Sequence, residues 1–221
     1  MGVAVSGGPD SVALLLLAHA ARAGSVEAAT VDHGLRAESA AEADWVCALC
    51  RDLGVPHETL RVDVEAGNLQ SKAREGRYRA LDEWLGRRGL AALATAHHAD
   101  DQAETLLMRL NRGSGLPGLA GVRPSGTIPL GRGRLLRPLL SWRKSELETL
   151  VHGAGIEPVA DPSNRDERFD RVRMRRALAE TDWLDPVALA RSAALLGEAE
   201  AALEEVLQDD SRASDGQGES R

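Results

Sequence analysis

Short apolar runs alternate with longer segments of helical periodicity through the first half of the chain, and this alternation limits the possible folds most strongly. The runs have the length of single strands and cover residues 3–5, 26–31, 58–62 and 90–94. Three of the helical segments end in a glycine, as helices commonly do: Gly24, Gly54 and Gly89. Strands separated by helices form βαβ units, so the sequence predicts an α/β fold with a parallel sheet.

The chain is expected to have three parts, separated where the composition changes. Residues 113–122 are rich in glycine and proline and close an α/β domain expected over residues 1–122. A smaller region over residues 123–208 is expected to hold a hairpin around 127–140, a helix over 144–154 and an irregular segment over 161–170. Residues 209–221 have few apolar side chains to bury, which predicts a disordered, acidic polar tail.

The sequence favours neither a membrane nor a secreted protein. No apolar stretch reaches the roughly 18 residues that span a bilayer. A basic region does not precede the first apolar run, as it would in a signal peptide. We therefore expect a cytoplasmic protein without a membrane partner.

The net charge of −7 argues at first against a nucleic-acid partner. The charge is unevenly distributed, however, because acidic residues dominate residues 177–221 whereas basic residues outnumber acidic ones in residues 132–176. A basic segment next to an acidic tail is compatible with a phosphate-bearing partner, and equally with an ordinary solvated surface.

Cys47 and Cys50 form a lone CxxC within a segment of helical periodicity. The pair could be half of a metal site, a redox pair or part of the core. There is no second CxxC and no strand-turn context around this one, so we favour core packing.

The segment SGGPDS, residues 6–11, lies between the first expected strand and a helix. Ligands of parallel sheets bind at the carboxyl ends of the strands. Gly7 and Gly8 allow a ligand to approach the backbone, and Ser6 and Ser11 add hydroxyl groups near the helix N-terminus. An ordinary strand-to-helix turn would also explain the glycines. Asp10 favours a nucleotide with Mg²⁺, because a carboxylate repels phosphates unless a cation lies between them.

The segment AHHADDQAET, residues 96–105, follows the fourth expected strand. On a helix, His97, Asp101 and Glu104 would share one face, where two carboxylates and an imidazole require a cation or a polar substrate. Such groups suit metal contact and proton transfer. An exposed acidic first turn is the alternative. On the same helix His98 and Asp100 would point more to the side, where they could serve as capping groups.

Two further segments contribute polar groups. VDHGLR, residues 31–36, follows the second expected strand and therefore borders the same cleft as residues 6–11. Alternatively, its His33 is a capping or packing group at the exit of the strand. Four arginines follow the expected irregular segment, at Arg171, Arg173, Arg175 and Arg176. They could form a solvated helix face, or they could bind phosphates through paired N–H donors.

These motifs together resemble those of a known enzyme family. SGGPDS is similar to the pyrophosphate loop of the N-type ATP pyrophosphatases, the PP-loop superfamily. The order SGGPDS, VDHGLR, AREGRYRAL, AHHADDQAETLLMRLNRGSG, RPLL and DPSN resembles the tRNA(Ile)-lysidine synthetases from residue 3 to about residue 178. The resemblance implies a Rossmann-like domain of the adenine nucleotide alpha hydrolase type, with a small helical C-terminal appendage.

The resemblance also implies a reaction. Such a ligase uses ATP and Mg²⁺ to adenylate the wobble cytidine of the tRNA(Ile) that has a CAU anticodon. Free L-lysine then displaces AMP, which changes the codon read from AUG to AUA. The flipped wobble base needs a cleft, and arginine planes or Trp142 could stack on it because the chain has one Phe and one Tyr.

The family motifs assign roles by position. ATP would be bound by Ser6, Gly7, Gly8, Pro9, Asp10, Ser11 and His33. Mg²⁺ would be held by Asp10 and Asp101. The catalytic residues would be Asp10, His97, Asp101, Glu104 and one arginine among Arg171, Arg173 and Arg175, of which we expect Arg173. RNA and substrate contacts would come from Arg74, Arg77, Arg171 and Arg175.

The match also has departures. Many family members continue into further C-terminal domains and begin with a helix before the first strand, so we expect a short form or a fragment. Val172 occupies a position where the family tends to have asparagine. Another PP-loop enzyme that thiolates tRNA, an amidotransferase synthetase domain and a nucleotide-binding module without catalysis remain alternatives. The oligomeric state, including a homodimer, stays open.

Overall fold

The computed structural model describes residues 1–34, 38–62, 69–159 and 170–215. The chain separates into two compact units. The first comprises Met1–His98 and Pro124–Asn164, and the second comprises Ala99–Arg123 and Arg165–Arg221. Each unit is described by itself below.

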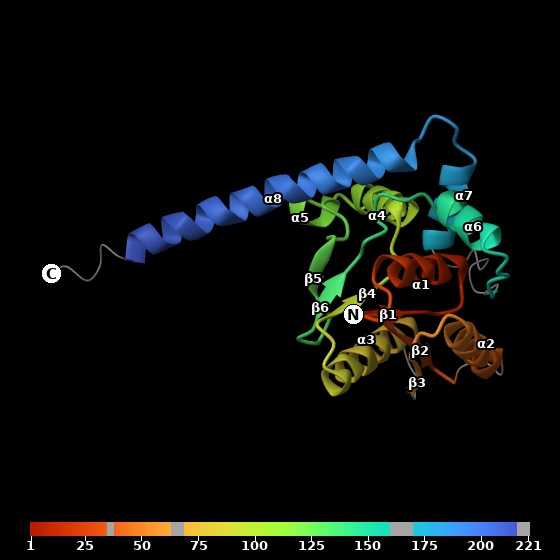
Figure 1. The fold of residues 1–221 in the computed structure, drawn as a ribbon. Helices are drawn as coiled ribbons and strands as arrows, with labels where there is room; N and C mark the ends of the chain where they lie inside the picture. The colour runs from red at the N-terminus through yellow and green to blue at the C-terminus, as the bar shows by residue number, and fades with distance from the viewer. Residues whose placement is uncertain (35–37, 63–68, 160–169, 216–221) are drawn as a thin grey trace. The chain divides into compact units, whose positions relative to one another are not determined.

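The first unit contains a six-stranded sheet in the order β3-β2-β1-β4-β6-β5 (Figure 1). The strands are β1 (Gly2–Ala4), β2 (Glu27–Asp32), β3 (His57–Arg61), β4 (Ala92–Ala94), β5 (Ser125–Thr127) and β6 (Arg134–Leu136). All neighbours pair in parallel except β5, which is antiparallel to β6. The predicted parallel α/β fold is confirmed. The hairpin expected around residues 127–140 is also confirmed, and it begins at Ser125.

Four helices of this unit flank the strands: α1 (Pro9–Ala21), α2 (Glu38–Asp52), α3 (Leu69–Arg88) and α6 (Lys144–Gly153). The helix predicted over residues 144–154 is thus confirmed as α6. The glycines expected after three helices have positive φ angles of 74°, 67° and 63° at Gly24, Gly54 and Gly89. These are the left-handed conformations that end helices.

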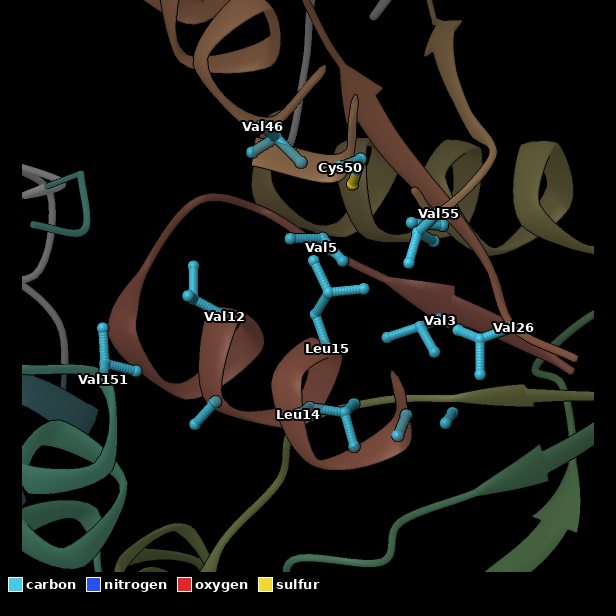
Figure 2. Packing of buried hydrophobic residues seen from close by; sticks show 14 of the residues in the cluster. Val3, Val5, Val12, Leu14, Leu15, Val26, Val46, Cys50, Val55 and Val151 are labelled. Atoms are coloured by element: carbon cyan, nitrogen blue, oxygen red, sulfur yellow. The ribbon is translucent and has the colours of Figure 1, made fainter. Parts of the chain in front are cut away.

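The core lies on both faces of the sheet because successive strand residues point to opposite sides. Val3 of β1 and Val5, which directly follows this strand, pack on one face with Leu15 of α1, Val46 of α2 and Val151 of α6 (Figure 2). The other face is covered by α3, whose buried residues Tyr78, Leu81, Trp84 and Leu85 pack against Ala29, Leu93 and Leu135. Figure 2 also shows Cys50 within the first cluster, as core packing predicts.

The second unit is helical in its described residues. It contains α4 (Ala99–Asn111), α5 (Leu116–Leu119), α7 (Asp170–Ala179) and α8 (Pro186–Asp215), and α4 packs against α5, α7 and α8. None of the helices that the structure describes is both long and apolar enough to cross a membrane.

These units differ from the division expected at residue 122. Residues 124–164 belong to the first unit because β6 pairs with β4, whereas α4 belongs to the second unit, where it packs against α7 and α8. Residues 209–215, expected in a disordered tail, continue α8, as helix propagation allows once a helix has formed. Residues 216–221 lie outside the described part, as do residues 161–169 of the irregular segment expected over 161–170. Its last residue, Asp170, begins α7.

Candidate functional site

The loop after β1 lies where the direction of strand order reverses. From β1 the sheet proceeds to β2 and β3 on one side and to β4 on the other. Where the connections from two neighbouring strands run to opposite sides of the sheet, a crevice forms at the carboxyl ends of those strands. Doubly wound sheets bind their ligands in this crevice. The glycine loop, residues 6–11, follows β1 at this point.

The glycine loop combines a left-handed glycine with a helix N-terminus. Gly7 has a φ of 87°, and Gly8 is the N-cap of α1 without a side-chain hydrogen bond to the cap. Pro9 occupies the first turn, where its missing N–H costs nothing. The Ser11 hydroxyl donates to the Gly8 carbonyl at 2.9 Å and accepts from the Ser6 amide at 3.1 Å. The loop is therefore braced by its own side chains, and the first turn of α1 is available to an anion.

Asp10 has two differently placed carboxylate oxygens. Its side chain is 29% exposed, and Oδ2 lies 3.5 Å from Nε2 of His98. Oδ1 is buried and has no hydrogen-bond partner among the residues that the structure describes. Such an oxygen is unfavourable without a ligand, so its environment fits a cation.

The described residues contain no group of three or more His, Cys, Asp or Glu side chains arranged to hold a metal ion. This arrangement still fits Mg²⁺, which commonly binds to one or two carboxylates together with substrate phosphates. Asp10 is the carboxylate in the first turn of α1, beside the helix N-terminus that suits a phosphate.

His97 and His98 differ from the sequence-based expectation. Helix α4 begins at Ala99, so the prediction that His97 shares a helical face with Asp101 and Glu104 is wrong. His97 instead lies in the loop after β4, with Nδ1 3.1 Å from the Thr95 hydroxyl. His98, expected as a capping group, is 2% exposed and lies beside Asp10. The sequence shows two adjacent histidines but does not show which one turns inward.

His33 lies just beyond β2, also at the carboxyl edge of the sheet. Both ring nitrogens are buried and have no hydrogen-bond partner within the described part of the chain. Burial lowers the pKa of His33, and the nearby charge of Arg77 lowers it further, which favours the neutral ring. Asp32 is oriented separately, since it accepts from the Gly34 amide at 2.9 Å and the Ser39 hydroxyl at 2.7 Å.

Two of the arginines predicted to contact RNA lie on α3. Arg74 and Arg77 are exposed. The Arg74 guanidinium lies 5.1 Å from the ring centre of Tyr78, within range of a cation–π contact. The charge of Arg77 lowers the pKa of His33, so Arg77 and His33, both predicted site residues, lie near each other.

Within the second unit, two arginines of α7 bind two carboxylates of α4. Glu104 is 1% exposed, and it accepts from Nε of Arg171 and from Nε of Arg175, each at 2.7 Å. Arg171 also donates through Nη2 to Oδ1 of Asp101 at 2.6 Å. We call these four residues the arginine–carboxylate cluster. A buried carboxylate requires such partners, which explains why both arginines face α4.

Arg173 belongs to a different set of contacts. It donates to Asp170 at 2.5 Å, and Arg112 donates to the same carboxylate at 3.1 Å. These contacts hold the pKa of Asp170 below its usual range, chiefly through the hydrogen bond from Arg173. Arg173 is 67% exposed and lines a cavity of about 310 Å³ together with Met108 and Met174. Arg173 therefore has different surroundings from Arg171 and Arg175, which share Glu104, despite the regular spacing of the three.

The predicted site residues fall in both units. The glycine loop, His33, Arg74, Arg77 and His97 belong to the first, whereas Asp101, Glu104, Arg171, Arg173 and Arg175 belong to the second. The chain passes directly from His98 in the first unit to Ala99 in the second.

Both cysteines are free and lie on α2. Burial, and to a lesser extent the neighbouring Cys47, raises the pKa of the Cys50 thiol to about 11. A thiol with this pKa is a poor nucleophile and a poor metal ligand at neutral pH, which agrees with core packing.

Comparison with known proteins gives one matching family model, similar named relatives and a similar solved structure. The model of the PP-loop domain family matches residues 1–181. A protein of Novosphingobium aromaticivorans and one of Zymomonas mobilis, both named tRNA(Ile)-lysidine synthase, are 56% and 47% identical to the chain over 204 and 208 residues. These alignments cover 91% and 92% of this chain but 63% of each relative, so the chain spans less than two thirds of the length of these relatives.

A solved structure shows the same fold at low sequence identity. The U34-tRNA thiolase NcsA from Methanococcus maripaludis, determined with its [4Fe-4S] cluster, superposes with a TM-score of 0.75. Its sequence is 17% identical, and the match covers 89% of this chain and 71% of that chain.

Proposed function

The chain belongs to the PP-loop domain family, and on this premise we propose that it catalyses the tRNA(Ile)-lysidine synthetase reaction. The relatives that carry this name share about half of its residues over nine tenths of its length. The single observation in the structure that best supports the proposal is the glycine loop. In this loop Gly7 is left-handed and Oδ1 of Asp10 has no hydrogen-bond partner among the described residues, and the loop follows the strand at which the order of a doubly wound sheet reverses.

The proposed reaction has two steps. The C2 oxygen of the wobble cytosine attacks the α-phosphorus of ATP, and the bond to the β-phosphate oxygen breaks to release diphosphate. The ε-amine of L-lysine then attacks C2, a proton leaves the nitrogen, and the C2–O bond breaks to release AMP. The product, lysidine, pairs with adenine, so the tRNA reads AUA.

The glycine loop would bind the triphosphate. The N–H groups of the first turn of α1, the hydroxyl groups of Ser6 and Ser11 and the small residues Gly7 and Gly8 suit a phosphate chain. Asp10 would hold Mg²⁺, with Asp101 as a second carboxylate, and the bound cation would offset charge on the departing diphosphate. His33, at the adjacent strand end, would contact the nucleoside part of ATP.

The remaining predicted residues would act on the acceptor and the amine. His97 and Glu104 would position the cytosine or the lysine amine and handle its proton. One of the α7 arginines would offset negative charge on the adenylated intermediate, and we propose Arg173, which pairs with Asp170 and not with the α4 carboxylates. Arg171 and Arg175, which bind those carboxylates, would contact RNA or substrate. Arg74 and Arg77 would contact the anticodon arm. The partners would thus be ATP, L-lysine and a tRNA(Ile) with a CAU anticodon, in the cytoplasm, and a homodimer is a further possibility.

No observation favours the thiolase alternative. A thiolase needs reactive cysteines near the nucleotide, whereas Cys47 and Cys50 lie on α2 and Cys50 packs in the core. The shared fold with the thiolase NcsA concerns the architecture alone.

The direct test supplies ATP, Mg²⁺, labelled L-lysine and an unmodified transcript of the tRNA(Ile) with a CAU anticodon. We expect lysine to enter the RNA with release of AMP and diphosphate. Asp10→Asn should abolish incorporation, whereas Asp52→Asn, at the exposed end of α2, should leave it unchanged. Release of diphosphate with another acceptor, and no lysine in the RNA, would contradict the proposal.

Asp101→Asn gives a second test of the proposed roles. We expect loss of adenylation without loss of tRNA binding, because Asp101 would act on the metal and not on the RNA. Diphosphate release and gel-shift affinity measure the two properties separately. An equal loss of both would contradict a catalytic role for Asp101.

A further inference from the structure

His98 and Asp10 come together because their strands are neighbours. β1 and β4 pair in parallel, with Gly2 opposite Leu93 and Val3 opposite Ala94. The loops that follow these strands therefore leave the sheet at the same edge. His98, in the loop after β4, is 2% exposed, and its Nε2 lies 3.5 Å from Oδ2 of Asp10.

We infer that His98 is a positioning residue for Asp10: it holds Oδ2 so that Oδ1 is presented to the Mg²⁺ that accompanies ATP. This inference rests on the proposed function. His98 itself would touch neither the metal nor the nucleotide.

The inference follows from what Asp10 would do otherwise. An aspartate in the first turn of a helix readily folds back to accept from its own N–H groups. The N-cap of α1 is Gly8, which has no side chain to accept from these N–H groups. The Asp10 carboxylate extends instead toward His98 through one oxygen, while the other stays buried without a partner in the described chain. A side chain that fixes Oδ2 leaves Oδ1 as the oxygen available to a ligand.

The chemistry of the imidazole suits this role. Nε2 can donate to a carboxylate in the neutral tautomer that carries the hydrogen there, as well as in the protonated ring. Positioning therefore does not depend on the charge of His98. Nε2 and Oδ2 are 3.5 Å apart, which is longer than an ordinary N–H···O hydrogen bond. Contacts between the groups of an active site are often long before the substrate binds and shorten in the complex, so the separation is compatible with this role.

The alternative is that His98 only fills space under the loop, and substitutions separate the two roles. His98→Gln keeps an amide donor close to the position of Nε2, whereas His98→Leu keeps the bulk and removes the donor. The exposed His152 of α6 provides a matched control, His152→Leu.

The experiment measures ATP affinity of the full chain by calorimetry, in EDTA and over a series of Mg²⁺ concentrations. For His98→Leu we expect the Mg²⁺ concentration that gives half-maximal ATP binding to rise about tenfold or more, as is typical when a residue that orients a metal ligand is removed. Its affinity for ATP in EDTA should not change. His98→Gln should stay within about threefold of the unchanged chain, since its donor is retained, and His152→Leu should be indistinguishable from it.

Two results would overturn the inference. One is an unchanged Mg²⁺ dependence in His98→Leu. The other is an equal loss of ATP affinity with and without Mg²⁺, which would mean that His98 only supports the loop. If His98→Leu does not fold, His98→Asn, whose amide is too short to reach Asp10, is expected to show the same shift in Mg²⁺ dependence. Absence of Mg²⁺-dependent ATP binding by the unchanged chain would instead contradict the proposed function.

Discussion

Gly7 and Gly8 are adjacent residues of the glycine loop with different backbone requirements. Gly7 has a φ of 87°, and a Cβ atom there would lie 3.2 Å from Cγ2 of Val159. Gly8 has an extended backbone with a φ of −70°, and a Cβ atom there would come no closer than 3.8 Å, to Oγ of Ser6. Gly7 is therefore required by its left-handed backbone conformation. Gly8 is required only if a ligand approaches the backbone closely there.

This contrast predicts opposite effects of the two alanine substitutions on stability. Gly7→Ala should lower the free energy of unfolding by about 1–2 kcal/mol, the cost of a left-handed residue with a Cβ atom. Gly8→Ala should be neutral or stabilise the protein by up to about 1 kcal/mol, because it restricts the unfolded chain. Urea unfolding of the two variants checks the difference. Equal effects would contradict the assigned conformation of Gly7.

Cys50 provides a prediction for pH dependence. In the unchanged chain burial and, to a lesser extent, Cys47 raise the pKa of the Cys50 thiol to about 11. In a Cys47→Ser variant burial, the larger cause, remains, so the alkylation rate of Cys50 should still rise only at a pH above the ordinary thiol range. The unfolded chain, with an ordinary thiol, should react fully from about pH 8.5. Since the unfolded state ionises first, the contribution of Cys50 to stability should decline as the pH rises from about 9 toward 11. Rapid alkylation of the folded protein at pH 7 would instead indicate an activated thiol.

Helices α4 and α7 are joined by the arginine–carboxylate cluster. Arg171 and Arg175 of α7 were expected to contact RNA or substrate. In the structure both bind Glu104 of α4, whose side chain is 1% exposed. Helical periodicity places residues 171 and 175 on one face, since they are one turn apart. It does not show that this face packs on a buried carboxylate of α4.

The neighbouring arginines Arg175 and Arg176 test the structural value of the cluster. Arg175→Gln should lower the free energy of unfolding of the helical unit by about 2 kcal/mol or more, because it leaves Glu104 buried with a single arginine. Arg176→Gln removes a surface pair with Glu180, and should cost less than about 0.5 kcal/mol, since Arg176 is 62% exposed. Urea titration monitored by far-UV circular dichroism compares the two. Similar losses would contradict the role given to Arg175.

Electrostatics act at the scale of the whole molecule. The chain has 27 basic and 34 acidic residues, so its net charge of −7 does not favour RNA. Binding to tRNA would have to depend on local clusters of arginine. On α3, Arg77 lies near His33, whereas Arg87 is bound to Glu58 at 2.5 Å.

Salt dependence of tRNA binding tests this local arrangement. Arg77→Gln should weaken binding and lower the slope of log affinity against log salt by about one, as expected for one lost phosphate contact. Arg87→Gln, on the same helix and also exposed, should leave the slope unchanged because its partner is a glutamate. Filter binding over a range of salt concentrations measures both. An equal change in the two variants would contradict a specific contact by Arg77.

The sequence by itself determined the elements and their connection. Alternating strands and helices, the glycines after helices and the position of SGGPDS follow from local periodicity and backbone preferences, and each was found where it was predicted. Tertiary structure alone decided that His98 and not His97 faces Asp10, that Arg171 reaches Asp101 across 70 residues of sequence, and that residues 124–164 join the sheet. These features depend on strand pairing and on the partners that buried charges require, and neither leaves a local pattern in the sequence.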